Sequence, residues 1–370
     1  MDPLAALTAD ELERLLGLGF EPEAFSTLAH ALATGALPPN EIQGEVRPPP
    51  PGSIRPTAPS TSWQGDALHD VGLHMLYQGR VGLLVLNGGM ATRFGGRVKG
   101  VVDALPGRSF LALQLARLAA LAEKTGQPAP LLIMNSEATH EPTLSHLEGL
   151  PQKQLKEHTF CFVQSASPRL RPDGSLYRDS SGAISLHGPG HGDLLPSLRR
   201  SGALQWARER GIEYLLMANV DNLGASLAPG LLGRFVGSEA ELMVEVAPKL
   251  PGDKGGAPAE VDGRLKIVEG FAFPEAFDQD RIPVFNTNTL WFRADALDRD
   301  FPLRWYVVRK NVGGEEVVQF ERLVGQVSWF LETEWAQVGR DRFLPVKTQA
   351  DLEALQPRLR ELFGTRLEVL

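Results

Sequence analysis

The stretch LLVLNGGMATRFGGRVKG, Leu83 to Gly100, decides how the fold is interpreted. It begins with an apolar run typical of a buried strand, which stops at Asn87-Gly88-Gly89, and cations follow, among them Arg93 and Lys99. Glycine lets a ligand approach the main chain and its N–H groups, and parallel sheets bind ligands at the carboxyl ends of their strands. The pattern favours a phosphate site, although a tight turn with solvated basic residues would also fit it.

Similar apolar runs recur along the chain, and helical segments separate them. One helix is predicted from a cap at Ser109 to Gly126, and helical structure is predicted again over 194–211. Buried strands alternating with helices predict an α/β fold with a mostly parallel sheet covered on both faces. After Glu241 the turn Asp262-Gly263 predicts a hairpin, hence antiparallel excursions. The predicted strands are Val81–Leu86, Leu131–Met134, Phe160–Val163 and Tyr214–Ala218.

The N-terminal part predicts a small helical region. Thr8 and Glu11 fit a capping box, and Pro22 suits the first turn of a second helix that Gly35 ends. Four consecutive prolines then predict an extended connector over Arg47–Ser60. We therefore expect a helical region with its connector at 1–60, a catalytic domain at 61–340, and a short closing segment at 341–370.

Composition excludes several classes of protein. The net charge of −8 argues against a general nucleic-acid binder, which would present a basic surface. A single cysteine, Cys161, excludes an intramolecular disulfide and a cysteine-built zinc site. No apolar run approaches the length of a membrane span, and the N-terminus lacks the apolar core of a signal peptide. We expect a cytoplasmic protein without nucleic-acid or membrane partners.

Two familiar phosphate loops fail the test at residues 83–100. The Walker pattern needs Gly before its lysine and Ser or Thr after it, but Lys99 lies between Val98 and Gly100, and the dinucleotide pattern needs glycine where Met90 stands. The stretch instead resembles the signature of sugar nucleotidyltransferases, in the LNGG form of the eukaryotic-type UTP–glucose-1-phosphate uridylyltransferase family. Further segments resemble that family in the same order: MNS, FVQSASPRL, GPGHGDLLPSL, MANVDNLGA, KGG, VFNTNTLWF, VGGEEVVQFERLVG and RFLPVKTQADL.

The resemblance implies a Rossmann-like, GT-A-like fold and a reaction of UTP with a sugar 1-phosphate that gives a UDP-sugar and pyrophosphate. It places Lys99 and Lys347 on the phosphates, with Arg93 near them, and it makes Asp221 the ligand of Mg²⁺, a hard cation that prefers oxygen ligands. Because the phosphate of the sugar is already anionic near neutral pH, positioning and charge neutralisation are the chemistry required.

The same resemblance implies the binding residues. The amide of Gln164 offers a donor and an acceptor that complement uracil. His191 is expected to donate to the sugar phosphate, and its flanking glycines suggest a close ligand, whereas Asp193 is better explained as a helix cap. The implied nucleotide residues are Leu86, Asn87, Gly88, Gly89, Met134, Gln164 and Gly190, and the implied sugar-phosphate residues are His191, Asn219, Gly256, Glu269, Asn286 and Asn288.

Several departures from the family leave alternatives open. Ala91 stands where glycine is usual, Val98 where proline precedes the lysine, and Thr289 where asparagine is common, which puts the sugar in doubt. The family's C-terminal β-helix domain is not expected here, so a monomer is plausible. Glucose 1-phosphate is the expected substrate. The alternatives are galactose or N-acetylglucosamine 1-phosphate, or a UDP-sugar binding protein without catalysis.

Overall fold

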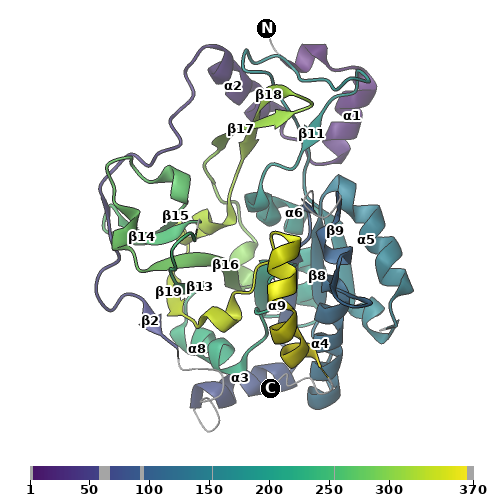
Figure 1. Ribbon diagram of the computed structural model, residues 1–370, viewed down its shortest axis with the longest axis vertical. Helices are drawn as coiled ribbons and strands as arrows, with labels where there is room; N and C mark the ends of the chain where they lie inside the picture. Colours follow the sequence, from purple (N-terminus) through teal and green to yellow (C-terminus); the bar gives the residue numbers. More distant parts are fainter. Residues whose placement is uncertain (1–2, 58–66, 92–95, 152, 254, 365–370) are drawn as a thin grey trace.

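The fold is built on an eight-stranded mixed sheet (Figure 1). The computed structural model describes residues 3–57, 67–91, 96–151, 153–253 and 255–364. β12, β3, β8 and β9 run parallel to one another, whereas β16 is antiparallel to its neighbours β12 and β13. In sheet order the strands are β2 (Arg55–Pro56), β19 (Thr333–Gln337), β13 (Leu242–Pro248), β16 (Val284–Arg293), β12 (Tyr214–Asn219), β3 (Val81–Leu86), β8 (Leu131–Asn135) and β9 (Thr159–Val163).

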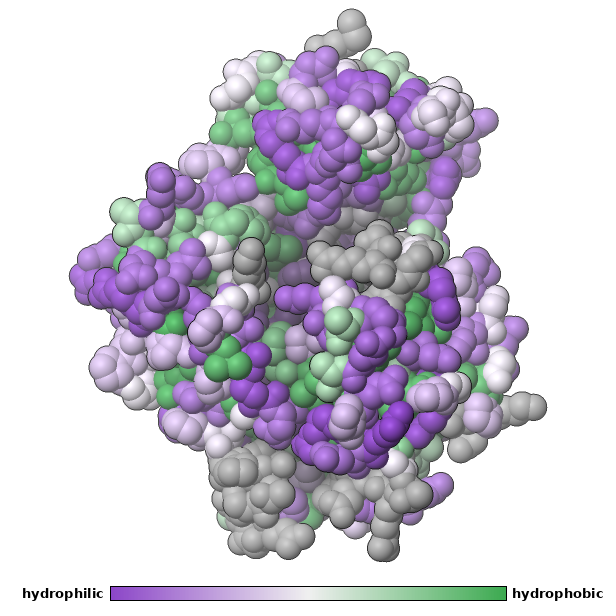
Figure 2. All heavy atoms as spheres, viewed as in Figure 1, coloured by the Kyte–Doolittle hydropathy of each residue, from purple (hydrophilic) through white to green (hydrophobic). Residues whose placement is uncertain are grey.

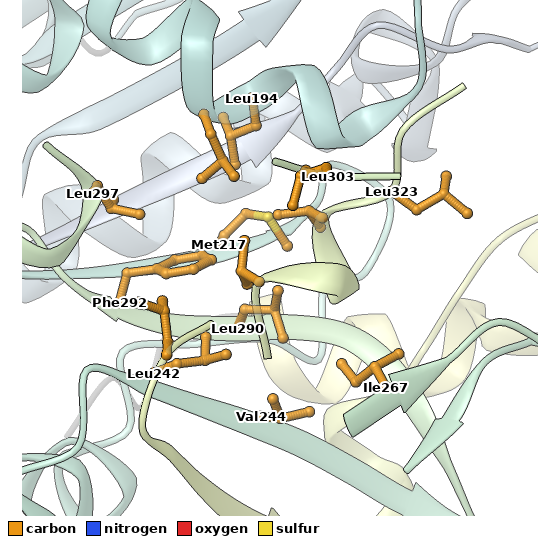
Figure 3. Close-up of a cluster of buried hydrophobic side chains, with 14 of the residues drawn as sticks. Leu194, Met217, Leu242, Val244, Ile267, Leu290, Phe292, Leu297, Leu303 and Leu323 are labelled. Carbon is orange, nitrogen blue, oxygen red and sulfur yellow. The ribbon is translucent and has the colours of Figure 1, made fainter. Parts of the chain in front are cut away.

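Alternate residues of each strand enter two separate cores. In β3, Leu83 and Val85 pack on one face of the sheet and Leu84 packs on the other, as the period of two requires. Figure 3 shows part of the second core, where Leu194 lies near Met217 of β12. The first face is covered by α3 (Ala67–Tyr77), α4 (Phe110–Thr125), α8 (Pro229–Ser238) and α9 (Gln349–Phe363), and the second by α6 (Leu194–Arg200) and α7 (Ala203–Glu209).

The elements predicted from the apolar runs are confirmed with small shifts. The four predicted strands correspond to β3, β8, β9 and β12, and the Ser109 hydroxyl caps α4 by accepting the Ala112 N–H at 3.0 Å. Gly126 ends α4 with a φ of 71°. The segment 194–211 is not continuous, because Gly202 adopts a φ of 77° between α6 and α7.

The antiparallel excursion follows β13. β14 (Ala257–Val261) and β15 (Arg264–Val268) form the predicted hairpin, and both of its turn residues, Asp262 and Gly263, have positive φ angles. The extended connector contributes a strand at each end: β1 (Val46–Arg47) pairs with β14, and β2 joins the edge of the main sheet. Pro56 can lie in β2 because edge positions do not require its missing N–H.

The upper lobe combines the N-terminal helices with later strands (Figure 1). The predicted capping box opens α1 (Ala9–Gly17), and Pro22 opens α2 (Pro22–Ala33). Phe25 and Leu32 of α2 pack on Val318 and Phe320 in a third core. The strands of the upper lobe are β10 (Ser167–Pro168), β11 (Leu186–His187), β17 (Tyr306–Val312) and β18 (Glu315–Glu321). The three-part division at 60 and 340 stays a prediction.

Short elements complete the fold around the tip of β3. The 3₁₀ turn η4 (Lys99–Val101) brings Lys99 back beside the end of the strand, and its backbone N–H donates to Gly89. The remaining elements are α5 (Glu137–Gly149), β4 (Met90–Ala91), β5 (Arg97–Val98), β6 (Asp103–Leu105) and β7 (Arg108–Ser109).

Candidate active site

A cleft of about 780 Å³ lies at the carboxyl ends of β3, β8 and β12. Figure 2 shows the surface hollowed beneath the upper lobe, with hydrophilic atoms around the hollow. The cleft brings together most of the residues that the sequence singles out: Leu86, Gly88, Gly89, Lys99, Met134, Gln164, Gly190, His191, Asn219, Asp221, Gly256, Glu269, Asn286, Asn288 and Lys347.

One predicted residue that the structure describes, Asn87, is not among them. Arg93 lies outside the described residues. Asn87 is fully buried: its Oδ1 accepts the Gly100 N–H at 3.1 Å, and its Nδ2 donates to Asn135 and Thr143 at 2.8 and 2.9 Å. The side chain of Asn87 therefore fixes the tip of β3 to the residue after Lys99, a structural task that its polar character alone did not distinguish from ligand binding.

The side chain of Gln164 lies between two glycines. A Cβ on Gly88 would come within 2.9 Å of its Nε2, and one on Gly188 within 2.2 Å. Side chains at either position would displace the amide. Gln164 itself is held by its backbone N–H, which donates to Asn135 at 2.8 Å, while its amide group hydrogen-bonds to no other described residue. The amide is thus placed in the cleft with its donor and acceptor both free for a ligand.

Lys99 and Asp221 form an ion pair at the ends of β3 and β12. Lys99 Nζ donates to Asp221 Oδ2 at 2.6 Å, and the same oxygen accepts the Val346 N–H at 3.1 Å. The Asp221 side chain is 8% exposed, so its charge is largely withdrawn from water. The other carboxylate oxygen, Oδ1, hydrogen-bonds to nothing in the described part of the chain and is free for a ligand.

Lys347 reaches the same end of the cleft from an irregular segment. Its segment, Phe343–Lys347, lies in no strand. Lys347 is exposed, and its ammonium group pairs with no carboxylate among the described residues. The cleft therefore has one cation engaged with Asp221 and a second one available.

His191 is held as a neutral hydrogen-bond donor. Its Nδ1 accepts the Val324 N–H at 3.0 Å, and burial lowers the pKa of the imidazole to about 4. A neutral ring that accepts at Nδ1 carries its proton on Nε2. His191 lines the cleft, so Nε2–H can donate to an oxygen of a bound ligand.

The glycines beside His191 leave room for a neighbouring segment of backbone. A Cβ on Gly190 would meet the Arg322 carbonyl oxygen at 2.3 Å, and one on Gly192 would meet the Arg322 carbonyl carbon at 2.7 Å. They are needed for close approach of the Arg322 backbone. Asp193 differs from the prediction, because its side chain makes no cap hydrogen bond to α6 and instead accepts the Ser165 N–H at 2.6 Å.

The cleft also holds a row of amides and one carboxyl group. Asn288 has a left-handed φ of 56°, and its Nδ2 donates to Asn219 Oδ1 at 3.1 Å. Its own Oδ1 is buried and has no partner in the described part of the chain. The carboxyl group of Glu269 also lacks a hydrogen-bond partner there, and burial raises its pKa to about 7. A Cβ on Gly256 would come within 3.1 Å of Glu269, so this glycine leaves room for the carboxyl group.

The three departures from the family pattern are accommodated locally. Thr289 is fully buried and accepts the Asn222 amide at 3.2 Å, so it does not contact the cleft that would hold the sugar. Ala91 lies in the short strand β4, whose extended backbone suits alanine. Val98 has a φ of −64°, the value that proline would impose. Lys254, quoted in the KGG segment, lies outside the described residues.

The upper lobe adds residues to which the sequence assigned no role. Lys310 and Glu321 line the cleft and form an ion pair at 3.2 Å, and Arg169 Nε donates to Gln319 at 3.1 Å. A signal was present in β18, where the apolar Val318 and Phe320 enter the third core and the intervening polar residues face the other way. The alternation of apolar and polar residues in β18 predicts a polar face of the strand, but it does not predict that this face borders the cleft.

The parallel sheet, the glycine-rich tip of β3 and the polar cleft at the strand ends define a nucleotidyltransferase-like α/β protein. The chain belongs to the UTP–glucose-1-phosphate uridylyltransferase family, whose model matches residues 25–368. A curated relative of that name from Hordeum vulgare is 36% identical over 293 residues, which cover 75% of this chain and 62% of the relative. The chain thus spans about three fifths of the length of such relatives.

Solved structures agree with this assignment. A UDP-glucose phosphorylase from Trypanosoma brucei matches with a TM-score of 0.75 and 25% identity, covering 93% of this chain and 77% of its own. A uridine diphosphate N-acetylglucosamine pyrophosphorylase from Trypanosoma brucei matches with a TM-score of 0.70 and 21% identity over 87% and 76% of the two chains, a likeness of fold alone. Among the described residues, no helix combines the length and apolar character needed to cross a membrane.

Proposed function

We propose that this protein transfers a uridylyl group from UTP to a sugar 1-phosphate, with glucose 1-phosphate as the sugar substrate. The observation that carries the proposal is the set of groups gathered in one cleft: the free Gln164 amide for a base, the Lys99–Asp221 pair with Lys347 for phosphates, and the Glu269 and Asn288 acceptors for hydroxyl groups. Membership of the UTP–glucose-1-phosphate uridylyltransferase family supports the proposed reaction.

In the proposed reaction, a phosphate oxygen of the sugar 1-phosphate attacks the α-phosphorus of UTP. The bond from that phosphorus to the bridging oxygen of the β-phosphate breaks, and pyrophosphate leaves. Lys99 and Lys347 offset the charge of the phosphates, and neutral His191 donates from Nε2 to a phosphate oxygen. The attacking oxygen needs no general base, since a phosphate monoester is largely ionised at neutral pH.

We also propose that Asp221 holds Mg²⁺ in the substrate complex. Mg²⁺ is commonly bound by one or two carboxylates together with substrate phosphates, and the free Oδ1 of Asp221 fits that donor set. Among the described residues no group of three or more His, Cys, Asp and Glu side chains could hold a metal, so the phosphates would supply the remaining ligands. The ion would add positive charge where the phosphates meet. The cytoplasmic location and the monomeric state stay predictions.

The test is pyrophosphate release from UTP with a panel of sugar 1-phosphates carrying glucose, galactose or N-acetylglucosamine. We expect release with glucose 1-phosphate, its loss in EDTA and its recovery with excess Mg²⁺. Release with another sugar alone would replace the substrate but keep the reaction. Tight binding of UDP-glucose without turnover would favour a binding protein instead.

A further inference from the structure

The segment that carries Lys347 is docked by side chains rather than by a sheet. The Phe343 N–H donates to Arg340 at 3.0 Å, and the Lys347 N–H donates to Asp351 at 2.9 Å. Pro345 has no N–H to satisfy. The two N–H groups that remain, those of Leu344 and Val346, both point to the loop after β12. The register of the segment therefore depends on what accepts them.

The two acceptors are consecutive residues. Asn222 Oδ1 accepts the Leu344 N–H at 2.9 Å, and Asp221 Oδ2 accepts the Val346 N–H at 3.1 Å. In an extended chain, N–H groups two residues apart lie on the same side. The pair of acceptors thus fixes both the position of the segment and the side that it presents to the cleft.

Asn222 differs from Asp221 in that it does not line the cleft. It is 1% exposed, and its Nδ2 donates to buried Thr289 at 3.2 Å, so the orientation of its amide is set from behind. The far end of the segment is held as well, because Asp351 belongs to the capping box that opens α9. Lys347 lies between these two attachments.

We propose that Asn222 is a positioning residue, which sets the location of the Lys347 ammonium group by accepting the Leu344 N–H. The role of Lys347 rests on the proposed function, whereas the docking of the segment 343–347 by Asn222 does not depend on it. Loss of the Asn222 carbonyl oxygen leaves a buried N–H without a partner, and the segment relaxes toward water. The phosphates then meet a lysine that is displaced, although no residue that contacts them has been changed.

The experiment compares N222A, N222D and a matched control, S328A. Ser328 is buried outside the cleft and accepts the Ile267 N–H at 2.9 Å, so S328A removes the same kind of bond elsewhere. We expect N222A to lower kcat for UDP-sugar formation roughly 10- to 100-fold, the effect of a small misplacement. N222D keeps the acceptor but loses the Nδ2 donor and buries a charge, so it should retain more of the rate than N222A without reaching the wild type, while S328A should leave the rate unchanged.

A double-mutant cycle with K347A separates positioning from general damage. If Asn222 acts through Lys347, N222A should have little further effect on kcat in the K347A background. Equal losses in both backgrounds would overturn the proposal.

Hydrogen exchange of the peptide spanning residues 343–348 tests the docking without any assay of activity. N222A should speed exchange there and S328A should not, and unchanged exchange in N222A would also overturn the proposal. A wild-type protein without turnover would refute the proposed function while the exchange result still decides the docking.

Discussion

Two sets of cleft residues satisfy their polar groups in different ways. We name them for the ligand parts proposed above: the phosphate end comprises Lys99, Asp221 and Lys347, and the sugar end comprises Asn288 and Glu269. At the phosphate end, Lys99 and Asp221 bond to each other, and Asp221 also accepts a backbone N–H. At the sugar end, Asn288 keeps a buried oxygen without a partner. The carboxyl group of Glu269 likewise has no hydrogen-bond partner among the described residues. The Lys99–Asp221 ion pair must reorganise when a ligand binds, whereas the acceptors of the sugar end have no protein partner to give up.

This difference has energetic consequences. Buried polar groups without partners reduce stability, so the sugar end holds its acceptors at the expense of the free energy of folding. At the phosphate end, most polar groups have partners in the free protein. Free energy is needed there only when a ligand binds and the ion pair reorganises. Changes at the phosphate end should therefore affect turnover most, and changes at the sugar end should affect sugar affinity and stability.

The largest effect is expected at Lys347. K347A removes the cation that is not engaged with Asp221 and should lower kcat by roughly 10²–10³-fold, as loss of one charge-stabilising group does in other enzymes. Steady-state kinetics of pyrophosphate release measures it. K124A, at an exposed lysine of α4, is the control. Near-normal turnover in K347A would contradict the role assigned to Lys347. It would also mean that changes at the phosphate end affect turnover no more than changes at the sugar end.

Gln164 sharpens the comparison. Its amide has no hydrogen-bond partner among the described residues, as at the sugar end, but it is proposed to bind the base. Q164A should reduce the preference for UTP over CTP about 10- to 100-fold, since a site built to pair a polar edge discriminates strongly. The measurement is kcat/KM with each nucleotide. Unchanged selectivity would place the base elsewhere in the cleft.

Asn288 tests whether the sugar end trades stability for binding. N288G removes the side chain but suits the φ of 56°, so it should raise KM for the sugar 1-phosphate about 10-fold with UTP affinity retained. N288A loses the same contacts and keeps the strained backbone, so it should be less stable than N288G by about 1 kcal/mol. Urea unfolding measures the difference. Equal stability of the two variants would remove the strain argument.

The sequence predicted the sheet well because a buried strand needs a continuous apolar run, and Val81–Leu86 coincides with β3. It also collected most cleft residues, because strand ends of a parallel sheet meet at one edge. It did not predict the buried hydrogen bonds of the Asn87 side chain, because their partners, Gly100, Asn135 and Thr143, come from other segments of the chain. The purpose of Gly190 was equally hidden, because its close neighbour is the distant backbone of Arg322.

The smallest expected effect is a pH dependence at Glu269. Burial raises the pKa of this carboxyl group to about 7, so between about pH 4.5 and 7 the folded protein holds a proton that the unfolded chain has lost. The stabilisation is fully present below that window and is lost as pH rises through it. E269Q cannot titrate there, so the melting temperature of the wild type should fall relative to E269Q by roughly 2–4 °C between about pH 5 and 8.

Because His191 titrates in both proteins, its contribution cancels in the difference. E275Q, at an exposed glutamate, should track the wild type at every pH. Parallel melting curves for wild type and E269Q would mean that the carboxyl group is already solvated or paired, and the sugar end would then resemble the phosphate end.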